Sequence, residues 1–376
     1  MARSRGILVT GASGYLGSLI VATLLRHDTA RLLTPVRGEP DSVLAPVGAE
    51  LATQSVSSVE PLLDRLEIPR LPPADELDRL VPMMRDFGVD EVIHCAACLD
   101  YFNRAALEAV NVDLTRRMVE LAVKAGVRRF VYISTAFSSG YIETAVPEEL
   151  HGEPSRDPTD YTRTKRVAEH IVASSGLSYL IVRPSIVIGD SRDGHYSGKR
   201  YGIYQLWSGI ERLLCREWQP EMHAFAPSRS LANLVHQDVF QSAFLAAHRL
   251  LPDNSILNLV SANDVAPTSR QLWDTWLDAC NRPRRRVYYE RMADIPMRAI
   301  PPAQRALLAL ASVNLDIISH DWSFDTGGLA MLRGRGLDFV DTTLDSVEVC
   351  QRQFMAQSAA IQRFLSRINK EETIAI

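Results

Sequence analysis

The stretch T-G-A-S-G-Y-L-G at residues 10–17 carries three regularly spaced glycines between two apolar segments. The short run before it predicts a buried strand, and the residues after it have the spacing of a helix. In such a turn Gly11 permits a tight bend, Gly14 lets the backbone approach a pyrophosphate, and Gly17 allows close packing of helix on strand. The first turn of the helix offers free N–H groups and a positive dipole end. Because strand, glycines and helix occur together, the stretch predicts a dinucleotide-binding turn rather than a plain turn.

The first half of the chain continues this alternation of strand and helix patterns. Apolar runs that predict further strands lie at 30–37, 90–97, 129–137 and 178–189, with helical patterns at 111–126 and 161–174. Strands that alternate with helices form parallel sheets covered by helices on both faces. We therefore expect an α/β fold with a doubly wound parallel sheet. Residues 38–88 are harder to interpret, and we expect there one or two helices and a weak strand near 49–55.

The pattern becomes mixed after residue 190. It predicts a strand at 255–263, an amphipathic helix at 270–280 and a helical hairpin within 296–318. We expect a nucleotide-binding domain made of residues 1–190 with about 230–262. Residues 191–229 and 263–376 are expected to form a smaller, mixed C-terminal lobe that binds the substrate, although the pattern assigns no role to residues 281–376.

The composition is that of a globular protein and excludes several classes of function. Of 376 residues, 46% are hydrophobic and 23% are charged, and the formal net charge is −4. A nucleic-acid partner is not expected, because the one basic cluster, at 282–286, is interpreted as a solvated turn. No apolar stretch reaches the roughly 18 residues of a membrane span, and no apolar signal region precedes the first strand. With five irregularly spaced cysteines, we expect a reduced, cytoplasmic protein without an integral membrane segment.

The end of the second predicted strand indicates which nucleotide binds. NAD sites usually carry an acid there for the ribose hydroxyls, whereas NADP sites have a nearby arginine for the 2′-phosphate. The segment T-P-V-R-G-E-P has Arg37 and no acid before Glu39. We therefore predict NADPH in preference to NADH. The alternative is that Arg37 is a solvated loop residue.

A hydroxyl cluster, S-T-A-F-S-S-G-Y at 134–141, follows another predicted strand. Hydroxyls at the carboxyl edge of a doubly wound sheet face the ligand crevice. Thr135 or Ser134 could therefore donate a hydrogen bond to a substrate oxygen. The alternative, which is commoner for such clusters, is capping or turn chemistry.

Tyr161 and Lys165 lie one helical turn apart in D-Y-T-R-T-K, 26 residues after Thr135. A free tyrosine has a pKa of about 10 and is a poor acid or base at neutral pH. We expect the Lys165 ammonium and an oxidised nicotinamide to lower that pKa. The chain has only four lysines, so a lysine at this spacing is unlike a chance pair. Tyr161 is therefore predicted to be the proton donor.

These motifs, taken in order, resemble the short-chain dehydrogenase/reductase superfamily in its extended branch. H-C-A-A at 94–97 resembles the loop where that branch passes beside its cofactor, and the similarity covers roughly residues 5–275. The resemblance implies a Rossmann sheet and a catalytic triad of Thr135, Tyr161 and Lys165. The cofactor-binding residues that we expect are Thr10, Gly11, Ser13, Gly14, Tyr15, Leu16, Gly17, Arg37, Ala96, Ala97, Lys165, Pro184, Ser185 and Val187.

Within that branch, R-P-S-I-V-I-G-D-S at 183–191 resembles fatty acyl-CoA reductases and thioester reductase domains. The segment at 234–249, with Asp238 in a V-x-x-D-V pattern, fits the same group. This resemblance implies NADPH-dependent reduction of an acyl thioester, bound to coenzyme A or to a carrier protein, to an aldehyde. Onward reduction to the alcohol stays open. The alternative is another extended member, such as a sugar-nucleotide epimerase or dehydratase or a hydroxysteroid-type dehydrogenase.

Some features depart from the family pattern or carry no site. The acidic segment expected after the third strand has no clear equivalent at 49–60. Cys95 and Cys98 are interpreted as packing residues, and no metal site is predicted, since no second ligand pair has suitable spacing. The apolar stretch at 305–315 is expected to pack on the lobe rather than contact a membrane. A homodimer through the helices flanking Tyr161 is common in the superfamily.

Overall fold

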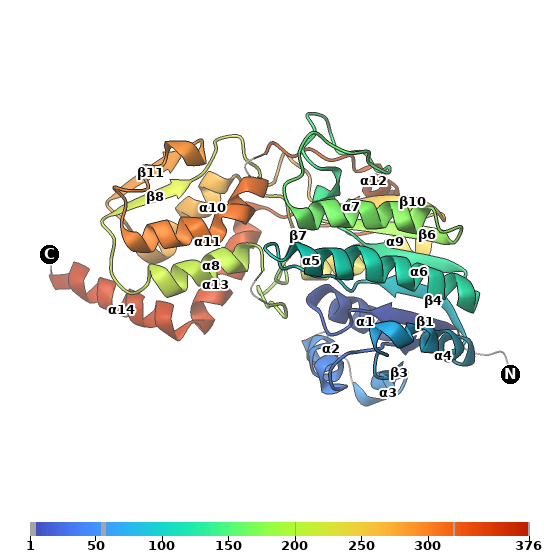
Figure 1. The fold of residues 1–376 in the computed structure, drawn as a ribbon. Coiled ribbons are helices and arrows are strands. Elements are labelled where there is room, and N and C mark those ends of the chain that lie inside the picture. The colour runs from blue at the N-terminus through green and yellow to red at the C-terminus, as the bar shows by residue number, and fades with distance from the viewer. Residues whose placement is uncertain (1–4, 54–57, 200, 319, 375–376) are drawn as a thin grey trace. The chain divides into compact units, whose positions relative to one another are not determined.

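The computed structural model describes residues 5–53, 58–199, 201–318 and 320–374 (Figure 1). The chain divides into two compact units, each made of three segments. The first unit comprises Met1–Ser185, Phe240–Leu259 and Asp325–Phe339, and the second comprises Ile186–Val239, Val260–Phe324 and Val340–Ile376.

Within the described residues, seven parallel strands form the sheet of the first unit, in the order β10-β6-β5-β4-β1-β2-β3. The strands are β1 (Gly6–Thr10), β2 (Arg31–Leu33), β3 (Leu66–Glu67), β4 (Val89–His94), β5 (Arg129–Ile133), β6 (Ser178–Pro184) and β10 (Ser255–Leu259). The order runs outward from β1 and β4 in opposite directions, which makes their junction a topological switch point. The predicted doubly wound parallel sheet is thus confirmed.

Helices cover both faces of this sheet. The crossover from β1 to β2 through α1 (Tyr15–His27) and the crossover from β4 to β5 through α6 (Leu114–Ala125) run toward opposite edges. Right-handed crossovers therefore place α1 and α6 on opposite faces. On the face of α6, the helices α4 (Leu80–Phe87) and α7 (Asp160–Ala173) share its core, while α9 (Gln237–Leu250) lies beside α1. Figure 1 shows α6 and α7 side by side on their face.

The stretch from 38 to 88 is more helical than its sequence suggested. The weak strand expected near 49–55 is wrong for its first part, because α2 extends over Asp41–Thr53; residues 54–55 lie outside the described ranges. Val43, Val47 and Leu51, four residues apart, are all buried, which is helical and not strand spacing. After the helix α3 (Glu60–Leu63) and β3, a 3-10 turn at Ala74–Arg79 leads into α4.

The apolar run at 178–189 forms two strands rather than one. It divides at Ser185 into β6, inside the large sheet, and β7 (Ile186–Ile188), which pairs with β9 (Leu234–His236) in the second unit. A second small sheet of that unit joins β8 (Glu221–Phe225) and β11 (Arg285–Tyr289).

The second unit packs its helices around an aromatic core. These helices are α8 (Ile203–Leu213), α10 (Ser269–Trp276), α11 (Pro302–Ile318), α13 (Leu344–Gln357) and α14 (Ala359–Ile374). Tyr204, Trp207 and Trp276 are buried at the centre, with the ring of Phe354 against all three. The hairpin expected at 296–318 is a single helix, α11, and its apolar face is buried as expected. Among the described helices, none is long and apolar enough to cross a membrane.

The two largest differences between the unit boundaries and the expected domain boundaries lie at 325–339 and 230–239; residues 186–190 and 260–262 also belong to the second unit. Residues 325–339 belong to the first unit, where α12 (Gly327–Gly334) packs on β10 and Asn258 Nδ2 donates to the carbonyl oxygen of Asp325 at 3.0 Å. Residues 230–239 belong to the second unit because β9 pairs with β7. Which unit binds cofactor and which binds substrate stays a prediction.

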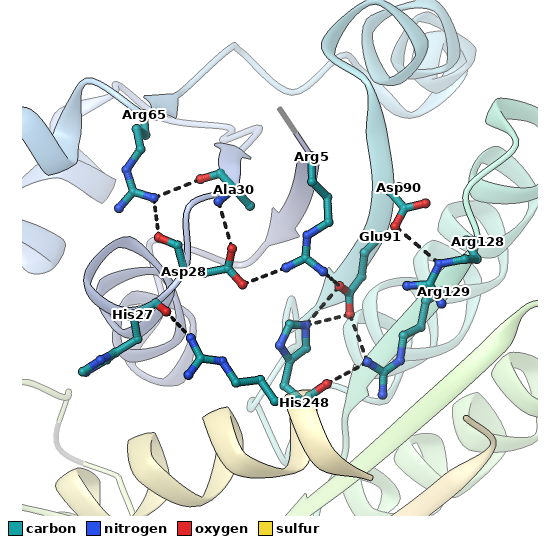
Figure 2. A network of polar contacts seen from close by, with 11 residues as sticks. Arg5, His27, Asp28, Ala30, Arg65, Asp90, Glu91, Arg128, Arg129 and His248 are labelled. Atoms are coloured by element: carbon teal, nitrogen blue, oxygen red, sulfur yellow. Dashed lines mark hydrogen bonds and ion pairs between the residues drawn. The ribbon is translucent and has the colours of Figure 1, made fainter. Parts of the chain in front are cut away.

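Charged side chains gather where the strands of the first unit begin (Figure 2). Glu91 of β4 is fully buried, and His248 Nε2 lies 2.9 and 3.0 Å from its two carboxylate oxygens. Arg5 and Arg129 reach the same carboxylate at 3.7 and 3.9 Å, and Arg129 also donates to the carbonyl oxygen of His248 at 2.8 Å. This network fastens α9 to β4 and β5 at the edge opposite to the carboxyl ends of the strands.

Candidate active site

The glycine turn has the close approaches that its spacing predicted. Gly11 has a φ of +72°, and a Cβ placed on it would lie 2.6 Å from the backbone nitrogen of Ala96 in the loop after β4. A Cβ on Gly17 would lie 2.1 Å from the carbonyl oxygen of Gly11. Because Gly14 at the N-cap of α1 provides no side-chain cap, the N–H groups of the first turn stay available to an anion. The turn therefore fits a dinucleotide at the switch point between β1 and β4.

A buried histidine fixes the loop that passes beside this turn. His94, at the end of β4, has its pKa lowered to about 3 by burial and by the charge of Lys165, so it stays neutral. Thr115 donates to the carbonyl oxygen of Asn111 at 2.8 Å and lies 3.0 Å from His94 Nε2, so Nε2 carries the proton. His94 Nδ1 then accepts from Thr10, 2.8 Å away, whose oxygen accepts from the backbone N–H of Ala96. This chain of hydrogen bonds holds the expected cofactor loop against β1.

Thr135 and Ser134, at the end of β5, have different partners. Thr135 caps the short 3-10 helix Ala136–Ser139, accepting from the backbone N–H of Phe137 at 3.5 Å. The capping alternative is therefore seen in the structure, although an accepting oxygen leaves the hydroxyl hydrogen of Thr135 able to donate. Ser134 donates to the Glu169 carboxylate inside the protein, so it is less suited than Thr135 to contact a substrate.

Lys165 is buried on the inner face of α7. Its ammonium donates to the carbonyl oxygen of Ile133 at 2.6 Å and lies 4.1 Å from the ring centroid of Tyr132. Burial lowers the pKa of Lys165 to about 8, against the opposing effects of Cys95 and Glu169. The ammonium therefore lies at the carboxyl end of β5, because Ile133 is the last residue of that strand and comes two residues before Thr135.

Tyr161 lies one turn earlier on α7, half-buried, with its ring edge-on to Tyr101 at a centroid distance of 5.7 Å. Burial raises the pKa of Tyr161 above its usual value, and Tyr101 and Cys95 add to this effect. This direction holds for the chain alone; the expectation that Lys165 and an oxidised nicotinamide together lower the pKa stays a prediction. The tyrosine is held in its protonated form, which is the form that donates.

A fully buried ion pair holds α7 in place. Glu169 and Arg183 are both 0% exposed, and the guanidinium donates to the two carboxylate oxygens at 3.0 and 2.6 Å. The same carboxylate accepts from Ser134 and from Ser138, while Arg183 also donates to the carbonyl oxygens of Pro147 and Glu149. The pair thus ties the helix that carries Tyr161 and Lys165 to β5 and β6. The sequence did not predict this ion pair, although Glu169 follows Lys165 by one helical turn on the buried face of α7.

Asn111 joins the cofactor loop to α7 and was also missed. It lies in a π-helical segment, Glu108–Asp113, that interrupts the helix between α5 (Arg104–Leu107) and α6; such segments recur at functional sites. Its side chain accepts from the backbone N–H of Cys98 at 2.7 Å and donates to the carbonyl oxygen of Cys98 and to Thr164. The π-helical turn could not be seen in the apolar spacing, because it shifts the helix by one residue.

Arg37 is exposed just beyond β2, with a second arginine close by. Val36 bridges Arg70 in the backbone, so Arg37 and Arg70 follow the ends of neighbouring strands. Among the described residues no ion pair is recorded for either guanidinium. The sequence singled out Arg37 only, because the pairing of Arg70 depends on a strand of two residues.

The other expected residues lie as follows. Ser13, Tyr15 and Leu16 are partly or fully exposed in the glycine turn, and Ala97 is exposed beside Ala96. Pro184 ends β6 and Ser185 follows it; the Ser185 hydroxyl is buried without a hydrogen-bond partner in the described part of the chain. Val187 lies in β7 of the second unit.

The cysteines beside the site have the chemistry of packing residues. Cys95 and Cys98 are both free thiols, and burial raises the pKa of Cys95 to about 12. A thiol with so high a pKa is a poor nucleophile at neutral pH. In the described ranges no group of three histidine, cysteine or carboxylate side chains could hold a metal ion.

The sequence is similar to known proteins of one NAD-binding family. A model of an NAD-binding family, described as "Male sterility protein", matches residues 9–243. The chain is similar to peramine synthetase ppzA of Metarhizium majus, with 30% identity over 204 residues, which are 50% of this chain and 7% of that protein. It is also similar to the putative fatty acyl-CoA reductase CG8306 of Drosophila melanogaster, with 28% identity over 233 residues, 49% of this chain and 43% of that protein. The chain thus spans less than half the length of these relatives.

Solved structures share the fold over almost the whole chain. The terminal R domain of the myxalamid PKS-NRPS pathway covers 96% of this chain and 93% of its own, with a TM-score of 0.74 and 19% identity. A thiolation-reductase di-domain from an archaeal non-ribosomal peptide synthetase has a TM-score of 0.67 at 17% identity, covering 94% of this chain and 75% of its own. The UDP-glucuronic acid 4-epimerase of Bacillus cereus, in complex with NAD, has a TM-score of 0.60 at 16% identity, covering 93% and 99%.

The resemblance drawn from the motifs is confirmed. The match extends from the glycine turn through β6 to α9, and it includes Tyr161 and Lys165. The chain belongs to the male sterility-type NAD-binding family, of thioester reductase type, within the extended short-chain dehydrogenases/reductases, which are NAD(P)-dependent oxidoreductases.

Proposed function

We propose that the protein is an NADPH-dependent reductase of acyl thioesters, with Thr135, Tyr161 and Lys165 as its catalytic residues. The observation that carries the proposal is Tyr161 one helical turn before the buried Lys165, whose ammonium lies at the carboxyl end of β5, in a chain of thioester reductase type. The nicotinamide cofactor would supply the hydride that turns the thioester carbonyl into an oxyanion. The remaining chemistry is proton donation and charge stabilisation by this chain.

Tyr161 gives its phenolic proton to the oxyanion. The phenol is protonated at neutral pH, because even a free tyrosine has a pKa of about 10, and a donor held in place at a developing negative charge stabilises it without reorganisation. Thr135 supplies a second hydrogen bond through the hydroxyl hydrogen that its capping role leaves available. The resulting hemithioacetal releases the thiol and leaves an aldehyde, and the same donors serve a second reduction to the alcohol.

Lys165 supports the tyrosine and binds the ribose of the cofactor. With a pKa of about 8 it is still largely charged at pH 7. Its contact with the carbonyl oxygen of Ile133 uses one of its three N–H donors, so donors remain for ribose hydroxyls. On α7 this lysine follows Tyr161 by one helical turn.

The residues of the first unit fit a phosphorylated dinucleotide. The glycine turn gives room for a pyrophosphate, because a side chain at Gly11 or Gly17 would collide with backbone. Arg37 and Arg70 place two guanidinium groups after neighbouring strands, at the position where a 2′-phosphate is bound in NADP sites. Their charges support NADPH over NADH.

A turnover assay tests the proposal directly. The protein is mixed with NADPH and a panel of acyl-coenzyme A and acyl-carrier thioesters, while the absorbance of NADPH and the release of thiol are followed. We expect turnover of thioesters, with one thiol released for each aldehyde formed. Turnover of free ketones or sugar nucleotides in the absence of any thioester turnover would contradict thioester reduction and leave another extended-family reaction.

Tyr161→Phe separates chemistry from binding. The variant keeps the ring that packs on Tyr101 and removes the proton, so we expect a loss in kcat of about 10²–10⁴-fold with NADPH affinity little changed. Tyr101→Phe is the matched control, since it also removes one phenolic hydroxyl beside the site. Equal losses in the two variants would argue against Tyr161 as the donor.

A further inference from the structure

Basic side chains surround a hollow between the end of α8 and the last helix, α14, inside the second unit. The hollow has a volume of about 570 Å³, and its floor includes Cys215 and Phe364. Its rim carries four arginines, Arg212, Arg216, Arg363 and Arg367, with Glu211 as the one carboxylate among the described lining residues. Lys370 extends the row along α14.

These cations are exposed and lack acidic partners. Among the described residues no carboxylate forms an ion pair with the rim arginines or with Lys370. Glu211 accepts from Ser358 at 2.6 Å. Arg367 donates to the carbonyl oxygen of Arg216 at 2.6 Å, which fixes its direction without neutralising its charge. The groove thus keeps a net positive charge on a chain whose formal net charge is −4.

Helix stability accounts for only part of this arrangement. Cations near the C-terminal end of a helix interact favourably with its dipole, which covers Arg212 and Lys370. The helix dipole does not explain Arg363 and Arg367, because they lie well before the C-terminal end of α14 and line the same hollow as the α8 arginines. Like charges four residues apart on a helix repel each other. The arrangement therefore favours a negatively charged ligand.

The distribution of the charges identifies the kind of ligand. On α14 they extend from Arg363 to Lys370, roughly 10 Å along the axis at 1.5 Å per residue, and α8 adds a second row. A single phosphate would gather its donors at one point. Phe364 is buried and offers no exposed ring to a nucleobase, and no exposed large apolar side chain of the described residues lies on the rim. A nucleic acid or a membrane surface therefore fits less well than a row of carboxylates.

We infer that this basic groove docks an acidic helix of a partner protein. Resting on the proposed thioester reduction, the partner is the carrier protein that delivers the acyl group, so that the enzyme takes carrier-bound substrate in preference to acyl-coenzyme A. Electrostatic complementarity of this kind raises the rate of association and fixes orientation.

A charge-reversal pair tests the groove. Arg212→Glu with Arg363→Glu changes two exposed rim residues for which no hydrogen bond is recorded in the described part of the chain. Arg116→Glu with Arg298→Glu is the matched control: both residues are exposed, away from the groove lining, and the change in net charge is the same. Circular dichroism establishes that both proteins fold.

The probe is a purified helical acyl carrier protein of net negative charge, with its phosphopantetheine arm, and either free or carrying an octanoyl group. Its affinity is measured by fluorescence anisotropy at low and high salt. We expect the parent and the control to bind with strong salt dependence and the groove variant to bind about tenfold or more weakly. With octanoyl-carrier as substrate, KM should rise by a similar factor in the groove variant, while KM for octanoyl-coenzyme A stays unchanged.

Each other result overturns the inference. Equal weakening in the control pair would assign the effect to net charge, and an equal rise in KM for octanoyl-coenzyme A would assign it to phosphate binding. Tighter binding of RNA or of anionic vesicles than of the carrier would assign the groove to another partner, and unchanged carrier affinity in the groove variant would remove its role. If no thioester is reduced at all, the proposed function fails, yet the affinity for the unacylated carrier still decides the docking.

Discussion

Removing the charge of Glu169 should destabilise the first unit more than any surface change. The Glu169→Gln variant leaves the Arg183 guanidinium buried at 0% exposure without its carboxylate. Breaking a buried ion pair from one side costs about 3–5 kcal/mol. We expect the lower end, about 3 kcal/mol, because Arg183 keeps the carbonyl oxygens of Pro147 and Glu149 at 3.1 and 2.8 Å. At roughly 2–4 °C for each kcal/mol in a unit of this size, the transition should fall by about 6–12 °C.

The distribution of tryptophans allows this loss to be located. All five tryptophans, at 207, 218, 273, 276 and 322, belong to the second unit. Calorimetry or far-ultraviolet circular dichroism should therefore show the lowered transition of the first unit, while tryptophan fluorescence reports the second unit. We expect Glu169→Gln to shift the first signal more than the second.

A second substitution separates the charge from the shape. Adding Arg183→Met to Glu169→Gln removes the orphaned guanidinium, and replacing both members of a buried pair by uncharged groups is often close to neutral. The double variant should therefore be more stable than Glu169→Gln alone. If the single variant melted with the parent, or if the second substitution added its own full loss, the ion pair would not hold α7 as we describe.

Three further predictions concern the cofactor and the lysine. Activity should fall as pH rises through about 8, where Lys165 in the folded protein loses its charge. The free energy of unfolding should instead rise between pH 8 and 10.5, because in this range Lys165 is protonated in the unfolded chain but not in the folded protein. Parallel pH profiles of kcat and of the melting temperature, moving in the same direction, would contradict this. Gly17→Ala should abolish NADPH binding in a fluorescence titration because its Cβ would lie 2.1 Å from a backbone oxygen, whereas Gly48→Ala, which meets nothing within 4 Å inside α2, should bind normally and gain about 0.5–1 kcal/mol. Arg37→Asp and Arg70→Asp should each weaken NADPH binding and leave NADH binding nearly unchanged, and equal losses for both nucleotides would remove these arginines from the 2′-phosphate.

Local patterns in the sequence were sufficient to predict the sheet, and they supplied most of the residues of the proposed site. The glycine spacing predicted the turn because close backbone approach requires residues without a Cβ, and Gly11 and Gly17 have such contacts. Tyr161 and Lys165 could be found together because one helical turn relates them. Thr135 could be found because it follows an apolar strand. In each case the pattern that led to the prediction is local, because it spans only a few consecutive residues.

The features that the sequence did not predict depend on distant partners. Glu169 meets Ser134 and Arg183, which lie on other elements, and Asn111 meets Cys98 and Thr164. Such contacts could not be predicted from one sequence, because no regular spacing along the chain relates residues that meet only after folding. The raised pKa of Tyr161 is a further case, because desolvation and the nearby Tyr101 and Cys95 act on it only once the residues around it are packed.

The segmented build of the first unit has a consequence for how the chain is made. The edge strand β10 and the helix α12 that packs on it come from 240–259 and 325–339, after long stretches of the second unit. During synthesis, β6 therefore keeps an unpaired edge until the chain has passed residue 259, and such edges readily join other strands. A fragment cut at residue 243, where the family match ends, would keep that open edge and lose His248 from the carboxylate of Glu91. Expression of the nucleotide-binding part by itself should therefore give aggregates rather than a smaller enzyme.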